Sequence, residues 1–196
     1  NANVGREVVA VRRGYALPDE SVRVVAMGKR LAVELKKGGV AFEEGDGELS
    51  EKPNYANLRV VAEGLMRDFI EGRTDRVELV YYKFLSAGNQ QLVCERLLPI
   101  ELPAKRVGEW NSEVPYILEP SRGELVESIV PREVALKLYT AALSALASEH
   151  AARMIAMQAA TDNADDLIGE LSVEYNKQRQ QAITTELLDI MGGQNG

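Results

Sequence analysis

The sequence is poor in the residues that build cross-links and metal sites. It has one cysteine, Cys94, and one histidine, His150, among 196 residues. A single cysteine excludes an intrachain disulfide framework, and the pair is too small a set for a zinc site, which takes about three or four such ligands. We expect Cys94, in a strand-like run, to be a small buried apolar side chain. We expect His150, which has no partner nucleophile, to lie on a helix surface or in ordinary packing.

Long apolar runs and a positive charge excess are also absent. No stretch of about 18 uninterrupted apolar residues predicts a membrane-spanning helix. The formal net charge of −7 argues against binding to a nucleic-acid backbone, because proteins with that role usually have basic surfaces. We therefore expect neither a nucleic-acid partner nor direct insertion into a membrane.

Two short patterns resemble a phosphate loop and a calcium site, but each lacks residues that such a site requires. Gly28-Lys29 lacks the glycine five positions earlier that a phosphate loop requires, since Arg23 stands there, and Arg30 replaces its Ser or Thr. The acidic run 162–166 spreads its carboxylates around a helix and has no glycine-centred calcium loop, so a solvated face is expected. No catalytic constellation is found, and we expect no cofactor and no metal.

Short helical and strand-like segments alternate over residues 1–115. Apolar periodicity and glycine stops predict helices over 3–14, over 29–37 before Gly38-Gly39, and around 58–69 before Gly72. Strands are predicted over 22–26 and 40–42, and a hairpin over 76–86 and 91–100, whereas 43–53 reads as a loop. This alternation predicts a three-layer α/β sandwich with a mixed sheet, although about four strands make the sheet look incomplete.

A second region, residues 116–196, is almost entirely helical in pattern. Ser121 and Glu124 form a capping box, in which the serine bonds the N3 amide and the glutamate reaches back to the cap amide. Pro131 marks either a first helical turn or a kink in a helix that begins at Arg122. Some 60 residues at about 1.5 Å each give a rod of roughly 90 Å, which must project from a domain about 30–35 Å across.

The rod changes character along its length. Ala164, Ile168, Leu171 and Tyr175 step by four, three and four residues, the spacing of a coiled-coil seam, which predicts a partner helix. Residues 176–181, which we name the collar, contain no apolar side chain. The following residues end the rod in an apolar tip, made of Ile183, Leu187, Leu188, Ile190 and Met191. Periodicity leaves two interpretations open: the tip docks into another protein, or the helix folds back and buries it in its own domain.

Two long motifs resemble a known family. "ASEHAARMIAMQAATDNADDLI" and "YNKQRQQAITTELLDIMGG" are similar to the C-terminal signature of the gamma subunit of the rotary ATP synthase. The resemblance to the α/β domain of that family is weaker, and it is carried by "VVAMGKR" and "VYYKFLS…LLPI". The resemblance implies a non-catalytic central-stalk rotor subunit, of bacterial type. It would transmit torque between the membrane ion-driven rotor ring and the catalytic alpha/beta hexamer, coupling proton flow to ATP synthesis in the partner beta subunits.

The resemblance also implies partners and a location. The family's N-terminal segment supplies the first sheet strand and the partner helix of an antiparallel coiled coil, and this chain resembles a gamma subunit without it. The remaining partners are the alpha, beta and epsilon subunits and the rotor ring. The place is the cytoplasmic face of the bacterial inner membrane, as a peripheral subunit. Plant-type gamma subunits carry a regulatory cysteine pair that is absent here.

Individual residues take their roles from the same resemblance. Arg179, Gln180 and Thr184 align with contacts to a beta-subunit loop. Tyr116 and Glu119 align with the foot that meets the rotor ring. The bearing tip comprises Ile183, Leu187, Ile190 and Met191.

Two alternatives come from other classes. A stand-alone α/β enzyme or ligand-binding domain with a coiled-coil dimerisation arm would keep its seam to the end, which the collar does not. A membrane-surface protein with an amphipathic tail would carry basic residues near its end, whereas Glu186 and Asp189 are acidic.

Overall fold

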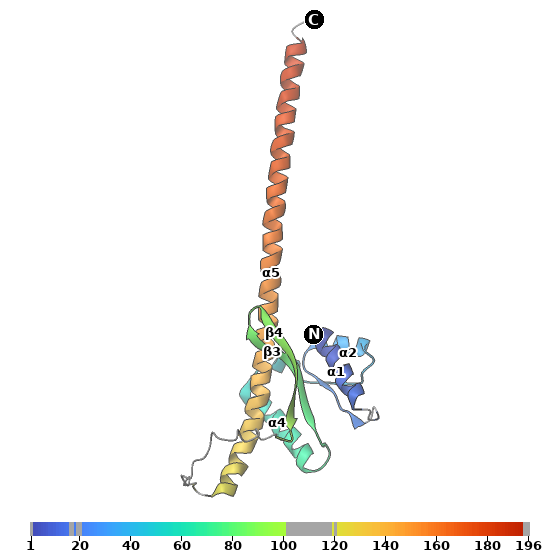
Figure 1. The fold of residues 1–196 in the computed structure, drawn as a ribbon, viewed down its shortest axis with the longest axis vertical. Coiled ribbons are helices and arrows are strands. Elements are labelled where there is room, and N and C mark those ends of the chain that lie inside the picture. The colour runs from blue at the N-terminus through green and yellow to red at the C-terminus, as the bar shows by residue number, and fades with distance from the viewer. Residues whose placement is uncertain (1, 16–17, 19–20, 101–118, 120, 194–196) are drawn as a thin grey trace, which may run out of the picture. The chain divides into compact units, whose positions relative to one another are not determined.

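The computed structural model describes residues 2–15, 18, 21–100, 119 and 121–193. The chain divides into two compact units, residues 1–150 and 151–196. Figure 1 shows the helices and strands of the fold. In chain order they are α1 (Ala2–Gly14), β1 (Val25–Ala26), α2 (Lys29–Lys37), β2 (Glu43–Glu44), α3 (Gly47–Glu51), α4 (Tyr55–Ile70), β3 (Val77–Ser86), β4 (Asn89–Leu98) and α5 (Arg122–Gly193).

The described strands form two separate pairs. β1 lies parallel to β2, with Val25 opposite Glu43. β3 and β4 form an antiparallel hairpin in which Tyr82 lies opposite Leu92. The predicted α/β class with a long C-terminal helix is confirmed, as is the hairpin. The four strands do not join into one continuous sheet within the described ranges. β1 and β2 are only two residues long, so each has few backbone groups left to bond a further strand.

The segment 43–53 is where the expectation of a loop was wrong. It contains β2 and the short helix α3. Asp46 caps α3, and its carboxylate accepts a hydrogen bond of 2.9 Å from the Glu48 amide. The strand expected over 40–42 lies slightly later, at Glu43–Glu44. The sequence hid these elements because only Leu49 supplies a large apolar side chain, and that side chain is buried.

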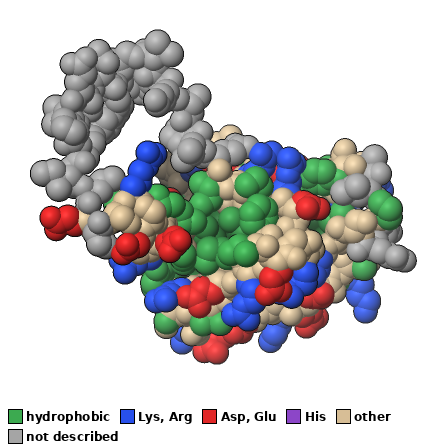
Figure 2. Space-filling model, turned by 90° about the horizontal axis from the view of Figure 1, so that it is seen from below, with side chains coloured by type: hydrophobic (Ala, Val, Ile, Leu, Met, Phe, Trp, Pro, Cys, Tyr) green, Lys and Arg blue, Asp and Glu red, His purple; other side chains and the backbone are tan. Residues whose placement is uncertain are grey.

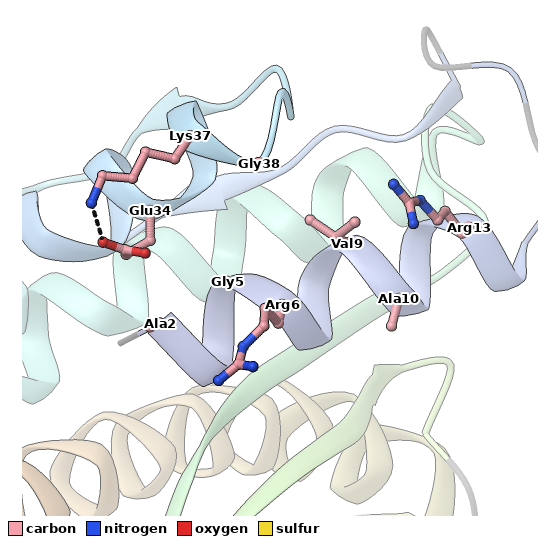
Figure 3. Close-up of a pocket in the computed structure, with 9 residues that line it drawn as sticks. All are labelled: Ala2, Gly5, Arg6, Val9, Ala10, Arg13, Glu34, Lys37 and Gly38. Atoms are coloured by element: carbon pink, nitrogen blue, oxygen red, sulfur yellow. Dashed lines mark hydrogen bonds and ion pairs between the residues drawn. The ribbon is translucent and has the colours of Figure 1, made fainter.

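Helices α1 and α2 pack closely because glycines lie at their crossing (Figure 3). A Cβ atom at Gly5 would lie 3.3 Å from the Glu34 Cβ, and one at Gly38 would lie 3.3 Å from a Val9 methyl. Larger side chains would therefore push the helices apart. A small core cluster comprises Ala26, Ala32, Leu35 and Val40.

The larger core lies between α4, the hairpin and the first part of α5. Leu58 and Ala62 of α4 are fully buried, which confirms the predicted apolar face of this helix. Helix α5 contributes three buried side chains to this core, Val134, Ala135 and Leu138. The remaining buried members are Leu49, Leu97 and Leu98.

The serine half of the predicted capping box is confirmed at the start of α5, whereas the Glu124 carboxylate meets the Ser121 hydroxyl rather than the predicted cap amide. The Glu124 amide donates to the Ser121 hydroxyl at 3.2 Å, and that hydroxyl donates to the Glu124 carboxylate at 3.1 Å. Pro131 lies inside the helix, so the interpretation with a start at Arg122 is the correct one.

The second unit is the remainder of α5. All side chains from residue 152 to residue 191 are exposed. The tip is therefore exposed as well, and α5 continues through it to Gly193 without a break. A helix with an apolar row and no core of its own offers that row for recognition.

Candidate partner-binding surface on the long helix

The predicted seam exists as an uncovered row on α5. Ile168, Leu171 and Tyr175 are 62%, 61% and 65% exposed. At about 100° per residue, the steps of four and three residues keep these side chains on one face of the helix. The row can therefore receive the side chains of a second helix, in the manner of knobs entering holes.

One seam residue escaped the sequence analysis. Met157 lies seven residues before Ala164, which in turn lies seven before Leu171, so it extends the row by one heptad. Its side chain is 65% exposed. The signal was present in the heptad spacing, but Thr161 interrupts the row and hides it. The apolar row ends with Tyr175, because Gln178 occupies the position seven residues after Leu171.

The collar presents hydrogen-bonding groups to solvent. Arg179 and Gln180 are exposed, and neither has a side-chain bond of its own in the described part of the chain. Gln178 does, since it donates to the Glu174 carboxylate at 3.2 Å. Thr184 donates its hydroxyl proton to the Gln180 carbonyl at 2.8 Å, so its oxygen remains as an acceptor. The guanidinium and amide can therefore bond a partner directly.

The tip follows the collar without a change of face. Ile183 lies one turn after Arg179 and Leu187 one turn later, in a single i, i+4 row. Their exposed fractions are 49% and 56%. Ile190, Met191 and Leu188 complete an apolar surface around the end of the helix, all of it exposed.

The predicted foot is only partly visible. Glu119 is exposed, just before α5. Tyr116 lies outside the described residues.

The first unit has two shallow grooves. One, of about 420 Å³, lies between α1 and α2 (Figure 3). Two of the three cations that line it are engaged, since Arg6 donates to the Asn3 side chain and Lys37 pairs with Glu34 at 2.8 Å; Arg13 is the third. The other, of about 450 Å³, is lined by Met66, Ile70 and Pro131 among charged neighbours. A space-filling view from below shows apolar side chains gathered on one face of the molecule (Figure 2).

Titratable groups in the hairpin form closed networks. Glu78 accepts bonds from the Tyr15 hydroxyl and, at 3.5 Å, from the Cys94 thiol. Burial, then Glu78 and Glu7, raise the pKa of Cys94 to about 11. The residue is nevertheless exposed overall, so the expectation of a buried cysteine was wrong. Its strand face is only partly covered, which a single strand-like run does not reveal.

A second network lies on the same hairpin. Burial and a 3.0 Å hydrogen bond to Glu95 raise the pKa of Tyr81 to about 12. For Glu95, burial acts to raise the pKa, but bonds from Tyr81 and Lys83 outweigh it and leave the pKa lowered. Both networks connect β3 to β4 through side chains. Within the described ranges, no group of three or more His, Cys, Asp or Glu side chains is placed to hold a metal ion.

The fold and this surface define an α/β protein whose long C-terminal helix carries an uncovered apolar row, a polar collar and an apolar tip. The family model for ATP synthase matches residues 1–196. The ATP synthase gamma chain of Bacteroides fragilis is 44% identical over 196 residues, which cover 98% of this chain and 68% of that protein. The gamma chain of Parabacteroides distasonis is 43% identical, with 98% and 67% covered. That of Rhodopirellula baltica is 38% identical, with the same coverage.

The fold has a solved counterpart. The rotor of the mitochondrial ATP synthase from Euglena gracilis superposes with a TM-score of 0.53 at 18% identity, over 90% of this chain and 68% of that chain. The chain belongs to the ATP synthase gamma chain family. None of the described helices is both long and apolar enough to span a membrane.

Proposed function

We propose that this chain is the central-stalk rotor subunit of an ATP synthase. In this role it transmits torque between the membrane ion-driven rotor ring and the catalytic alpha/beta hexamer, and so couples ion flow to ATP synthesis. The observation that carries the proposal is the exposure of every side chain from residue 152 to residue 191. A helix with that much apolar surface requires partners to cover it.

The seam is the first of three contact zones. Met157, Ala164, Ile168, Leu171 and Tyr175 would pack against a second helix in an antiparallel coiled coil. In the family this helix comes from the N-terminal segment of the gamma chain. Isolated helices gain little stability from propensity alone, so such packing would stabilise this part of α5.

The collar, together with Thr184 just after it, is the second zone. Arg179, Gln180 and Thr184 would bond a loop of one beta subunit. Bonds of this kind contribute about 0.5–3 kcal/mol each, with the charged guanidinium at the upper end. They are strong enough to push a partner in one direction and weak enough to break at every step of rotation.

The tip is the third zone. Ile183, Leu187, Ile190 and Met191 would turn inside an apolar sleeve formed by the hexamer. Apolar contact is non-directional, so rotation of the tip breaks no oriented bond. The collar would therefore hold its partner through oriented hydrogen bonds, whereas the tip would rotate against its partner without breaking such bonds.

The chain itself would be non-catalytic, with ATP made in the beta subunits. The epsilon subunit and the rotor ring are the other partners we propose, and the exposed Glu119, together with Tyr116, belongs to the foot that meets the ring. In this proposal the chain is a peripheral subunit at the cytoplasmic face of the bacterial inner membrane.

The collar provides the test. We expect the double substitution Arg179→Ala and Gln180→Ala to lower the rate of ATP synthesis driven by a proton gradient severalfold in the assembled complex. The reason is that both directional donors are lost while the helix is kept, since Ala favours helix. Gln181→Ala is the matched control: it removes a similar exposed amide about 200° around the helix from Arg179.

The amount of assembled complex must be measured alongside, by quantifying the subunits in purified membranes. Normal synthesis in the double variant at normal assembly contradicts the collar assignment. Equal losses in the double variant and in Gln181→Ala would mean that the collar has no preferred face.

A further inference from the structure

The outer edge of β3 is closed by two serines of α5. The backbone amide of Phe84 donates to the Ser144 hydroxyl at 2.8 Å. The Ser148 hydroxyl donates to the backbone carbonyl of Tyr82 at 3.1 Å. In an antiparallel pair, alternate residues direct both backbone groups away from the partner strand. Tyr82 and Phe84 are such outward residues, so the two serines occupy the place that a neighbouring strand would take.

The geometry of helix and strand makes this double contact possible. Four residues of helix rise about 6 Å, and two residues of strand span about 6.8 Å. Ser144 and Ser148 lie one turn apart on the same helix face, and Tyr82 and Phe84 lie two apart on the same strand edge. The earlier serine meets the later strand residue, so α5 runs antiparallel to β3 here. A third bond, from the Lys137 ammonium to the Arg96 carbonyl, ties the same helix to β4.

Burial shows that the Ser148 hydroxyl is committed to this contact. Its side chain is 2% exposed, and it is the one buried polar side chain among the residues that the structure describes. A buried hydroxyl without a partner is unfavourable, and an alanine would fill nearly the same space. The neighbours Ala147 and Ala151 on α5 already have that smaller side chain. The hydroxyl at position 148 is therefore matched to the Tyr82 carbonyl.

We propose that Ser144 and Ser148 form a rotational lock, which we name the serine lock, that fixes the angle of α5 about its own axis against the edge of β3. The buried side chains of Val134, Ala135 and Leu138 already favour one face of α5, but apolar contact is non-directional, and the two hydrogen bonds add an oriented constraint. Hydrogen bonds weaken steeply with misalignment, so rotation about the axis breaks both bonds of the lock together. The serines are positioning residues: they contact backbone groups of their own chain and no reacting atom.

The consequence of the lock rests on the proposed function. In a rotor subunit, torque arises at one body and acts on another through α5. The lock would make the α/β unit and α5 turn as one piece. If the lock is absent, part of the torque is lost as slip of the helix against the hairpin.

The first test asks whether the lock exists, and does not depend on the rotor role. In the assembled complex carrying Ser144→Ala, we expect deuterium exchange at the Phe84 amide to rise roughly tenfold or more, because its acceptor is gone. Amides that bond within the β3–β4 ladder should keep their exchange rates. Ser172→Ala is the matched control, since that hydroxyl bonds its own helix at the Ile168 carbonyl, at 2.8 Å. Unchanged exchange at Phe84 overturns the lock.

The second test asks whether the lock carries torque. With Ser144→Ala and Ser148→Ala together, we expect ATP hydrolysis by the complex to continue while the protons pumped per ATP hydrolysed fall severalfold. A merely destabilised subunit would lower hydrolysis and pumping in proportion. Ser144→Thr retains the hydroxyl and should restore the ratio relative to Ser144→Ala.

An unchanged ratio with faster Phe84 exchange would overturn the torque role. If the double variant does not assemble, Ser144→Ala alone gives the ratio. A failure of the collar experiment leaves the Phe84 result standing, so the two proposals fail separately.

Discussion

Two stretches of one helix have opposite surroundings. From Arg122 to His150, α5 buries Val134, Ala135 and Leu138 in a core and engages the hairpin through hydroxyl and ammonium groups. From Ala152 to Met191 the same helix has an apolar row and an apolar tip separated by the polar collar, yet every side chain is exposed. The pattern of a sequence therefore shows which face of a helix is to be covered. It does not show whether the covering group lies in the same chain.

The largest expected contrast between the stretches is in stability. Leu138→Ala should lower the free energy of unfolding of the chain by about 2–5 kcal/mol, because it leaves a cavity beside Leu58 and Leu97. Leu171→Ala, the same change in the exposed stretch, should alter it by less than about 0.5 kcal/mol. Both replace leucine by alanine within a helix, so helix propensity cancels in the comparison. Urea unfolding followed by circular dichroism measures both, and equal costs would show that the seam is covered within the chain.

A smaller contrast is expected in thiol reactivity. Cys94 should react with iodoacetamide at pH 8 about tenfold more slowly, or more, than a cysteine placed in the exposed stretch by V173C in a C94S background. The reason is that a pKa of about 11 leaves little thiolate on Cys94, whereas an ordinary exposed cysteine titrates near 8.5. Mass spectrometry of the alkylated protein gives both rates. Similar rates would mean that burial and the carboxylates of Glu78 and Glu7 do not suppress the thiolate.

The smallest contrast concerns alkaline pH. The pKa of Tyr81 is raised from 10.0 to about 12, so its contribution to stability is complete below pH 10 and is lost as the pH rises toward 12. Tyr81→Phe should remove the highest step in the tyrosinate absorbance titration and flatten the loss of stability between those limits. Tyr175→Phe, in the exposed stretch, should leave that step in place. A step near 12 that survives in Tyr81→Phe would assign it to another residue.

Periodic elements could be predicted from the sequence because local pattern determines them. α2 ends at Gly38-Gly39, where Gly39 has a φ of +69°, and the apolar face of α4 lies where its spacing indicates. The capping serine of α5 could be predicted in the same way. The family could be identified because two long motifs of its signature lie on the continuous helix α5.

The elements that sequence analysis missed depend on contacts between distant residues. α3 has one large apolar residue, and its position depends on the Asp46 cap and the burial of Leu49. The exposure of Cys94 depends on what covers one face of the hairpin. Ser148 belongs to a family motif, but its role appears only with the Tyr82 carbonyl beside it, 66 residues away in sequence. The contact residues at the collar, tip and foot remain predictions.

Pro131 gives α5 an interruption that the rest of the helix does not show. A proline has no amide hydrogen, so the carbonyl of Glu127, four residues earlier, receives no helical bond from it. Proline is also well suited to the first turn of a helix. The helix can therefore begin afresh at residue 131, and the residues before it can unwind or change direction while the remaining turns stay intact.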